Sequence, residues 1–287
     1  MKRFLPFLFI ILWSSAFITG KVIVDHGSPF ASLSFRFVIV AIGFLCFAFF
    51  CNEKIIVKPR YILESSISGI LFHGLYLGGC FYAFSIGVPA NISALIVSMQ
   101  PILTNFLAGP ILNEKVTWKQ WIGILLGFFG TTLVLGFDVG RSIPIEGLIA
   151  TLIALIAATT GTLWQKKLSL NLPLSINNLY QAVGASIFLF LIMFFFEDPF
   201  INFNLKFILS MSWQIIIVSF GAFTILMYLI KVGSASKTSN LFFLIPPVSA
   251  LMAWFFLNEQ IFLNDILGFI ICSFGVYIAT KNKTKVV

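Results

Sequence analysis

An internal duplication constrains this chain most: residues 82–130 recur about 145 positions later as residues 228–275. The matched pairs before a one-residue shift are Tyr82/Tyr228, Gly87/Gly233, Ser93/Ser239, Leu95/Leu241 and Pro101/Pro247. Those after the shift are Leu112/Leu257, Asn113/Asn258, Glu114/Glu259, Gly123/Gly268 and Gly130/Gly275. Such self-similarity indicates that two copies of one structural unit build the fold.

The two copies differ in where their lysines lie, since each has lysines in a loop that is neutral in the other. The pairs are Lys115/Gln260, Lys119/Asn264, Ser85/Lys231 and Asn91/Lys237. Because cytoplasmic loops of membrane proteins collect Lys and Arg, this swap is expected of copies inserted in opposite directions. We therefore predict an inverted repeat, with one unit in residues 1–145 and the second in residues 146–287.

Apolar composition places these units in a lipid bilayer. Hydrophobic residues make up 59% of the chain and charged residues 10%, whereas a soluble domain carries about 25% charged residues. Ten apolar stretches have the roughly 20 residues that a helix needs to cross the hydrocarbon. They cover about residues 4–24, 30–51, 63–86, 91–111, 118–136, 147–168, 174–196, 208–231, 239–257 and 262–280. The predicted fold class is an all-α integral membrane protein with ten transmembrane helices in two inverted five-helix repeats.

Basic residues predict the orientation. With the N terminus inside, fourteen of the 18 Lys and Arg residues lie on the cytoplasmic side, and only Lys21, Arg141 and Lys206 lie outside. Both termini are then cytoplasmic. Lys2-Arg3 and Ser14-Ser15-Ala16 also resemble parts of a signal peptide, but cleavage would leave nine spans and break the five-plus-five match.

Several functional classes are disfavoured. The net charge of +8 is spread singly over helix ends, where lysines meet anionic head groups, so we expect no nucleic-acid partner. The four cysteines and two histidines show no metal-ligand spacing. We expect no metal, no cofactor and no enzymatic activity, and the absence of a phosphate-binding loop disfavours ATP hydrolysis.

Three motifs then reveal a family resemblance: Trp13-Ser14-Ser15-Ala16-Phe17, Arg36-Phe37, and the segment from Pro101 to Asn113-Glu114 with its repeat at Pro247 to Asn258-Glu259. With the ten spans, they resemble the EamA-type family of the drug/metabolite transporter superfamily over nearly the whole chain. The resemblance implies a bacterial inner-membrane transporter, typically an exporter, whose fifth and tenth spans lie outside a central cavity. Importers in the same superfamily are the alternative.

Helix breaks indicate where a solute would bind. In the fourth span, Asn91, Ser98 and Asn105 form a polar stripe, and Pro101 leaves the carbonyl of Val97 without its helical partner. Pro247 lies at the matching point of the ninth span. Paired breaks in two repeats point to a transporter binding site, although small residues and prolines also allow close helix packing.

Ionisable residues within spans give a second signal. His73 shares a helix face with Tyr76 and Cys80, and a histidine there can bind a carboxylate or relay a proton. The alternative is a neutral ring that a neighbouring helix satisfies. Arg36 is a candidate for coupling, for substrate contact, or for structural anchoring by snorkelling or by pairing with Glu146 or Asp25.

The predicted substrate-binding residues share polar or aromatic side chains, or a bend, within spans. They are Trp13, Ser14, Ser15, His73, Tyr76, Tyr82, Asn91, Ser98, Pro101, Asn105, Thr159, Thr162, Trp164, Gln165, Tyr228, Asn240 and Pro247. Trp164 could equally belong to the interfacial aromatic belt.

The sequence thus predicts a secondary carrier that exposes one central site alternately to each side. Its expected partners are the bilayer and a small neutral or zwitterionic amphiphile, such as an amino acid, with protons as a candidate coupling ion. A monomer or a homodimer fits equally. A channel and a non-transporting scaffold remain the rival classes.

Overall fold

The computed structural model describes residues 4–88, 90–136, 144–168, 172–257 and 262–281, and the side chains of 90, 91, 253, 256 and 257 are not described. Helices account for the architecture. In the first half they are α1 Leu5–Val24, α2 Pro29–Phe50, α3 Pro59–Gly69, η1 Ile70–Leu77, α4 Gly78–Ser85, α5 Ala90–Val97, α6 Gln100–Leu112 and α7 Trp118–Leu135. In the second half they are α8 Ile145–Leu168, α9 Leu174–Phe196, α10 Leu205–Trp213, η2 Gln214–Phe223, α11 Thr224–Val232, α12 Ala235–Ser239, η3 Asn240–Leu244, α13 Ile245–Leu257 and α14 Leu263–Lys281.

Within the described residues, nine helices are long and apolar enough to cross a membrane. Three of them combine consecutive elements: Pro59–Ser85 joins α3, η1 and α4, Ile92–Leu112 covers α5 and α6, and Leu205–Val232 joins α10, η2 and α11. The expected span at residues 239–257 is helical but divided into α12, η3 and α13. The all-helical prediction is therefore confirmed, with nine candidate spans rather than ten.

Side-chain burial is inverted relative to a water-soluble protein. Large apolar side chains such as Phe194, Phe195 and Phe196 are more than 70% exposed, while the amides of Gln165 and Asn240 are completely buried. Lipid is the solvent that accepts such a surface, and polar groups removed from water must find partners inside the bundle.

Local sequence explains where several helices begin and bend. Pro29 and Pro59 occupy the first turns of α2 and α3, where a missing N–H costs nothing. The Thr117 side chain accepts from the backbone N–H of Gln120 in a capping box that starts α7. As predicted for Pro101, regular helix stops at Val97 and resumes at Gln100.

The third and eighth spans share a rarer feature, because each contains a π-helical stretch at its centre. These stretches are η1 and η2. A π-helix has a wider turn than an α-helix and is found most often at functional sites. Both stretches contribute residues to the pocket described below.

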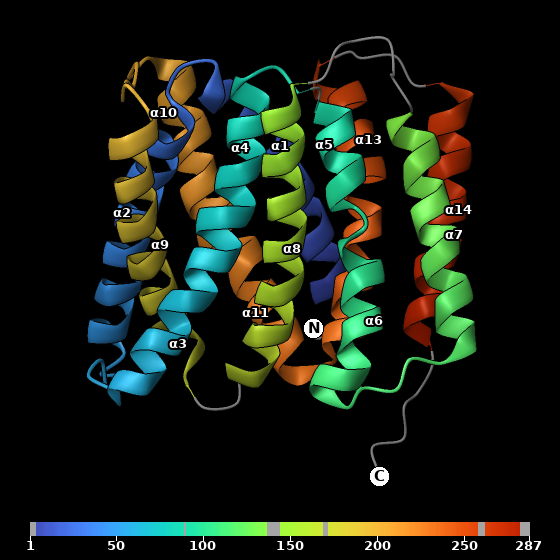
Figure 1. The fold of residues 1–287 in the computed structure, drawn as a ribbon, viewed down its shortest axis with the longest axis horizontal. Coiled ribbons are helices and arrows are strands. Elements are labelled where there is room, and N and C mark those ends of the chain that lie inside the picture. Colours follow the sequence, from blue (N-terminus) through green and yellow to red (C-terminus); the bar gives the residue numbers. More distant parts are fainter. Residues whose placement is uncertain (1–3, 89, 137–143, 169–171, 258–261, 282–287) are drawn as a thin grey trace.

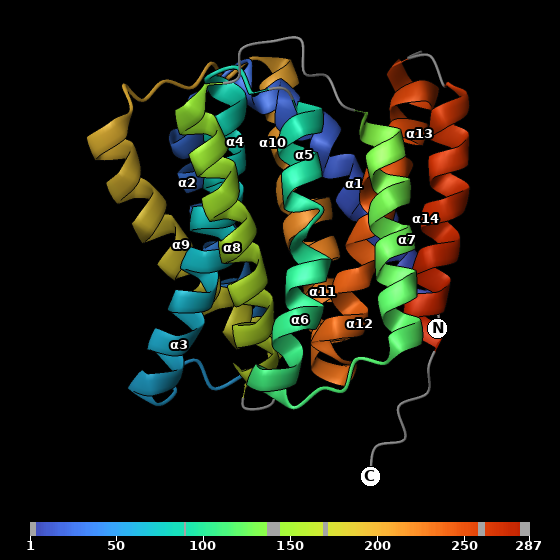
Figure 2. The same cartoon turned by 45° about the vertical axis from the view of Figure 1, so that its right-hand side comes forward.

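Helices α7 and α14 pack side by side at one edge of the bundle, away from α2 and α9 (Figures 1 and 2). Their backbones touch through glycines: a Cβ added at Gly123 would lie 2.5 Å from the carbonyl oxygen of Gly275 and the amide nitrogen of Ala279. Gly130 approaches Gly268 and Cys272 in the same way. These close backbone approaches hold the pair together at the periphery.

The loops after α2, α6 and α11 lie at one end of the bundle, the lower end in Figure 1. We call this the basic end because its loops and helix ends carry Lys54, Lys58, Lys115, Lys231 and Lys237. The loops after α1, α4 and α9 lie at the opposite end (Figure 1).

Candidate functional site

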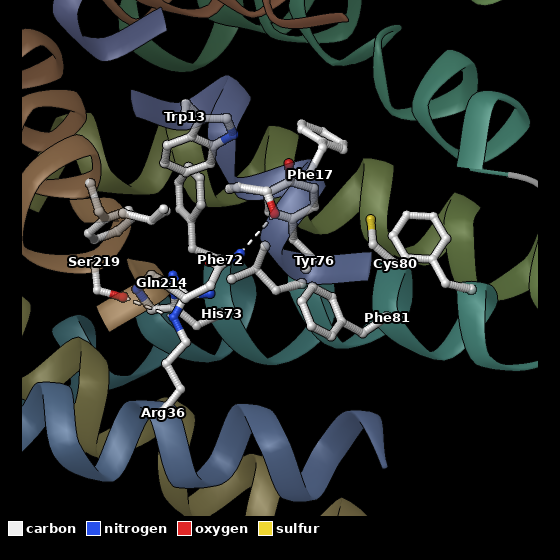
Figure 3. A pocket seen from close by; sticks show the side chains of 16 residues that line it. Trp13, Phe17, Arg36, Phe72, His73, Tyr76, Cys80, Phe81, Gln214 and Ser219 are labelled. Atoms are coloured by element: carbon white, nitrogen blue, oxygen red, sulfur yellow. Dashed lines mark hydrogen bonds between the residues drawn. The ribbon is translucent and has the colours of Figure 1, made fainter. Parts of the chain in front are cut away.

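A pocket lies between α1, α2, the η1–α4 segment and η2 (Figure 3). Its volume is about 60 Å³. The lining residues are Trp13, Ala16, Phe17, Gly20, Arg36, Phe72, His73, Tyr76, Leu77, Cys80, Phe81, Phe84, Gln214, Val218, Ser219 and Phe223. Gly20, Phe84 and Gln214 belong to the parts of their helices nearer the opposite end, so the pocket occupies that half of the bundle.

A second cavity of about 40 Å³ adjoins the first. The two share a wall of Trp13, Phe17, Tyr76, Cys80 and Phe84. The remaining lining comes from both bent spans, with Ser93, Ala94, Val97, Ser98, Phe242, Ile245 and Pro246. The helix breaks that the sequence indicated thus border the same internal space as the third span.

Arg36 provides the only positive charge among the residues that line the first pocket. Its side chain is 4% exposed, its Nε donates to the hydroxyl of Ser219 at 3.0 Å, and its guanidinium group lies 5.2 Å from the ring centre of Phe37. Arg36 does not snorkel to an interface, and it forms no ion pair with Asp25 or Glu146 among the described residues. The anchoring roles considered for it are therefore not observed.

His73 and Gln214 lie beside this guanidinium group (Figure 3). The imidazole is enclosed by Phe37 and Phe223, with ring centres at 4.3 and 4.4 Å, and its Nδ1 has no hydrogen-bond partner in the described structure. Gln214 donates from Nε2 to the carbonyl of Ala16 at 2.8 Å, but its buried Oε1 is likewise unpartnered. These two atoms at one pocket wall lack the partners that most buried polar atoms in native proteins have.

Aromatic rings form the other wall. Trp13 packs against Phe9 at 5.3 Å and against Phe242 at 5.6 Å between ring centres, and it is buried. Tyr76 is also buried and packs on Phe72. Trp13, His73 and Tyr76 are the predicted site residues that line the first pocket, and Ser98 lines the second.

A network of polar side chains at the basic end joins helices and lines neither of these two cavities. Ser68 and Gln181 both donate to Oε1 of Gln165, at 3.1 and 3.0 Å. Gln100 donates to the hydroxyl of Thr162 at 3.1 Å. These contacts join α3, α6, α8 and α9, so Thr162 and Gln165 hold helices together in this conformation.

Asn105 belongs to the same closed end, where it donates to Oδ1 of Asn240 at 2.8 Å and to the carbonyl of Pro101 at 2.7 Å. Glu114 accepts hydrogen bonds from the backbone N–H groups of Ala235 and Ser236 at 2.9 and 3.1 Å. The fourth and ninth spans are therefore fastened to each other at the basic end.

The other predicted site residues contact neither cavity. Ser14 donates to the carbonyl of Ile245, Ser15 accepts from Trp213, and Trp164 donates to the carbonyl of Glu64. Tyr82 stacks on Phe30, and Thr159 donates to the carbonyl of Leu155. Tyr228 and Pro247 lie outside the linings of both cavities. The side chain of Asn91 lies outside the described part of the chain.

Sequence reasoning missed Gln214 and Ser219 as site residues. Each is a polar residue inside an otherwise apolar stretch at about residues 208–231, which was the available signal. Their relation to Arg36 and His73 required the fold, because 183 positions separate Arg36 from Ser219.

Comparisons with known proteins agree with this architecture. The model of the EamA-like transporter family matches residues 3–136 and again residues 145–281. The uncharacterized transporters YvbV and YyaM of Bacillus subtilis are 26% and 28% identical over 96% and 95% of this chain, and over 90% and 91% of their own lengths.

A probable amino-acid metabolite efflux pump of Salmonella typhimurium is 26% identical over 59% of this chain and 55% of its own length. A protein of known crystal structure superposes with a TM-score of 0.83 at 17% identity, covering 98% of this chain and 97% of that one. This last likeness shows the fold. The chain therefore belongs to the EamA-like transporter family and is a multi-pass membrane protein.

Proposed function

We propose that this protein is a secondary transporter that exports a small, amino-acid-like amphiphile across the bacterial inner membrane by alternating access. The carrying observation is the pocket of Trp13, Arg36, His73 and Tyr76, which lies toward one end of the bundle, while hydrogen-bonded side chains join the helices at the other end. The name of the Salmonella relative, a probable amino-acid metabolite efflux pump, supports both the solute class and the direction.

We further propose ten membrane crossings in two inverted units, residues 1–145 and 146–287, with both termini cytoplasmic. The contacts between helices support this. Segment η1 of the third span packs on α8 of the sixth, and η2 of the eighth packs on α1 of the first. Likewise α6 packs on α8, and α13 packs on α1. Each of these contacts between the halves thus has a counterpart in which the roles of the halves are exchanged.

Carboxylates at the two ends of the bundle show the same exchange between the two halves of the chain. At the opposite end, Glu197 of the second half accepts from the backbone N–H groups of Phe30 and Ala31, at the start of α2. At the basic end, Glu53 of the first half accepts from the hydroxyl of Ser175, at the start of α9. A carboxylate is favourable at a helix N-terminus because it compensates the helix dipole. The basic end is then the cytoplasmic end by the positive-inside rule, and this conformation faces outward.

Counterflow in proteoliposomes tests transport itself. We expect uptake of a radiolabelled amino acid to accelerate when unlabelled solute is present on the far side, because a carrier reorients faster when loaded. Conductance without such acceleration would indicate a channel. The absence of flux for every member of a metabolite panel would leave only a scaffold role.

Proton coupling, which we propose with His73 as the titrating group, has its own test. We expect His73→Gln to abolish the solute accumulation that an imposed pH gradient drives, while counterflow at equal pH persists. His26→Gln is the matched control, because His26 lies outside the pocket, with Nδ1 within 2.8 Å of the Val22 carbonyl. If the His73 variant still responds to the gradient as the wild type does, the histidine is not the coupling group.

A further inference from the structure

Arg36 is a buried cation without a counterion. Its Nε donates a hydrogen bond to the hydroxyl of Ser219, and among the described residues no carboxylate forms an ion pair with the guanidinium group. Burying an unpaired charge in an apolar interior is strongly unfavourable, so buried charges in proteins are normally paired or serve a ligand. We propose that Arg36 binds the carboxylate of the transported solute, which is a monocarboxylate with an apolar body. This proposal rests on the transport function proposed above.

The charge of the pocket limits the charge of the solute. Arg36 is the one Lys or Arg that lines it, and no Asp or Glu lines it. One guanidinium group compensates one carboxylate through two parallel hydrogen bonds. Dicarboxylates and phosphate esters would bring an uncompensated second charge into the same apolar space. An amine without a carboxylate would bring a positive charge next to Arg36.

The positions of the remaining groups define the two ends of the solute. His73 and Gln214 lie with Arg36 on one side of the pocket, and Trp13, Phe17 and Tyr76 lie on the other (Figure 3). The unpartnered Oε1 of Gln214 can accept from an ammonium group next to the carboxylate, so an α-amino acid and a simple carboxylic acid share the chemistry recognised here. The apolar body of the solute then faces the aromatic wall.

Three probes of one carbon skeleton separate these possibilities: 4-methylpentanoate has the carboxylate alone, leucine has the carboxylate and the amine, and 3-methylbutylamine has the amine alone. We measure their binding to the purified full-length protein by calorimetry and by ligand-induced thermal stabilisation. We expect both acids to bind and the amine not to bind. The ratio of the affinities for leucine and 4-methylpentanoate distinguishes an amino-acid site from a general carboxylate site.

Substitutions locate the binding group. We expect Arg36→Gln to weaken binding of both acids at least about tenfold, because charge-assisted hydrogen bonds are lost, and Arg36→Lys to retain part of the affinity. Ser219→Ala keeps the charge and removes the group that orients it, so a smaller loss is expected. Arg60→Gln is the matched control, since Arg60 is exposed at the basic end and pairs with Glu64. A single symmetrical elution peak and the melting temperature establish that each variant is folded.

Unchanged acid binding in folded Arg36→Gln would overturn the assignment, as would binding of the amine with the affinity of the acids, or no binding of either acid to the wild type. Counterflow measured on the same preparations tests transport separately. Acid binding that depends on Arg36, without counterflow, would reject the transport proposal and leave the carboxylate site standing. Counterflow of either acid at wild-type rate in Arg36→Gln would reject the site alone.

Discussion

Gly123→Ala is expected to destabilise the protein, because the added methyl group forces helices α7 and α14 apart. The new Cβ would lie 2.5 Å from two backbone atoms of α14, and neither atom can move without displacing that helix. Overpacking of this kind costs about 1–3 kcal/mol. The predicted result is a lower melting temperature in detergent, with α7 and α14 the first helices to become accessible to protease.

Gly20→Ala provides the matched control. Gly20 also lies inside a helix, α1, but the nearest atom to a Cβ added there is 3.4 Å away, at the end of the Phe81 side chain. Both substitutions gain the same helix propensity, about 1 kcal/mol for alanine over glycine, so the difference between them isolates the backbone contact. Equal melting temperatures for the two variants would show that the close approach of α7 and α14 does not determine stability.

Glu114→Ala is expected to open the basic end of the transporter. Its carboxylate receives the two backbone hydrogen bonds described above and a third from the hydroxyl of Ser236 at 2.6 Å, which together cap α12. Loss of a helix N-terminal cap costs about 1 kcal/mol, and up to about 2, and here the cap also joins the fourth span to the ninth. A change of that size shifts a two-state equilibrium roughly five- to thirtyfold toward the conformation that lacks these contacts.

Cysteine labelling reports this opening. The four native cysteines are replaced, Thr162→Cys introduces a single cysteine, and its rate of labelling by a membrane-impermeant maleimide is measured. Thr162 is 1% exposed and lies in the polar network. We expect slow labelling with Glu114 present and faster labelling, by about the factor above, with Glu114→Ala. The control is Glu64→Ala, which removes another carboxylate near the same end. Faster labelling in both variants would argue against a specific role for Glu114.

The sequence predicted the helices well and the orientation of their side chains poorly. The break after Val97 follows from the chemistry of Pro101, and the peripheral pair was implied by the family resemblance. In the ninth predicted span the break was expected at Pro247, but it lies earlier, where the 3-10 segment η3 separates α12 from α13. Hydropathy records only how apolar a stretch is, so it does not reveal a change of helix type within it.

The residues of the candidate site were also predicted only in part from the sequence. Trp13, His73 and Tyr76 were identified from the sequence because polar and aromatic residues inside spans are conspicuous. Gln165, Asn105 and Asn240 met the same criterion, yet they close the basic end. Ten crossings, their inversion and the coupling ion remain proposals that the experiments above address.

The amino-acid sequence by itself determined that this chain enters lipid as helices, where those helices lie and which family it resembles, because hydrophobic transfer and proline geometry act locally along the chain. Only the tertiary structure decided which polar groups meet. A helix can rotate about its axis without changing its hydropathy, and the π-helical turns of η1 and η2 change the direction of every side chain that follows. Packing fixes those rotations, and so it places Arg36 beside Ser219 and His73 in a pocket, with no counterion of its own among the described residues.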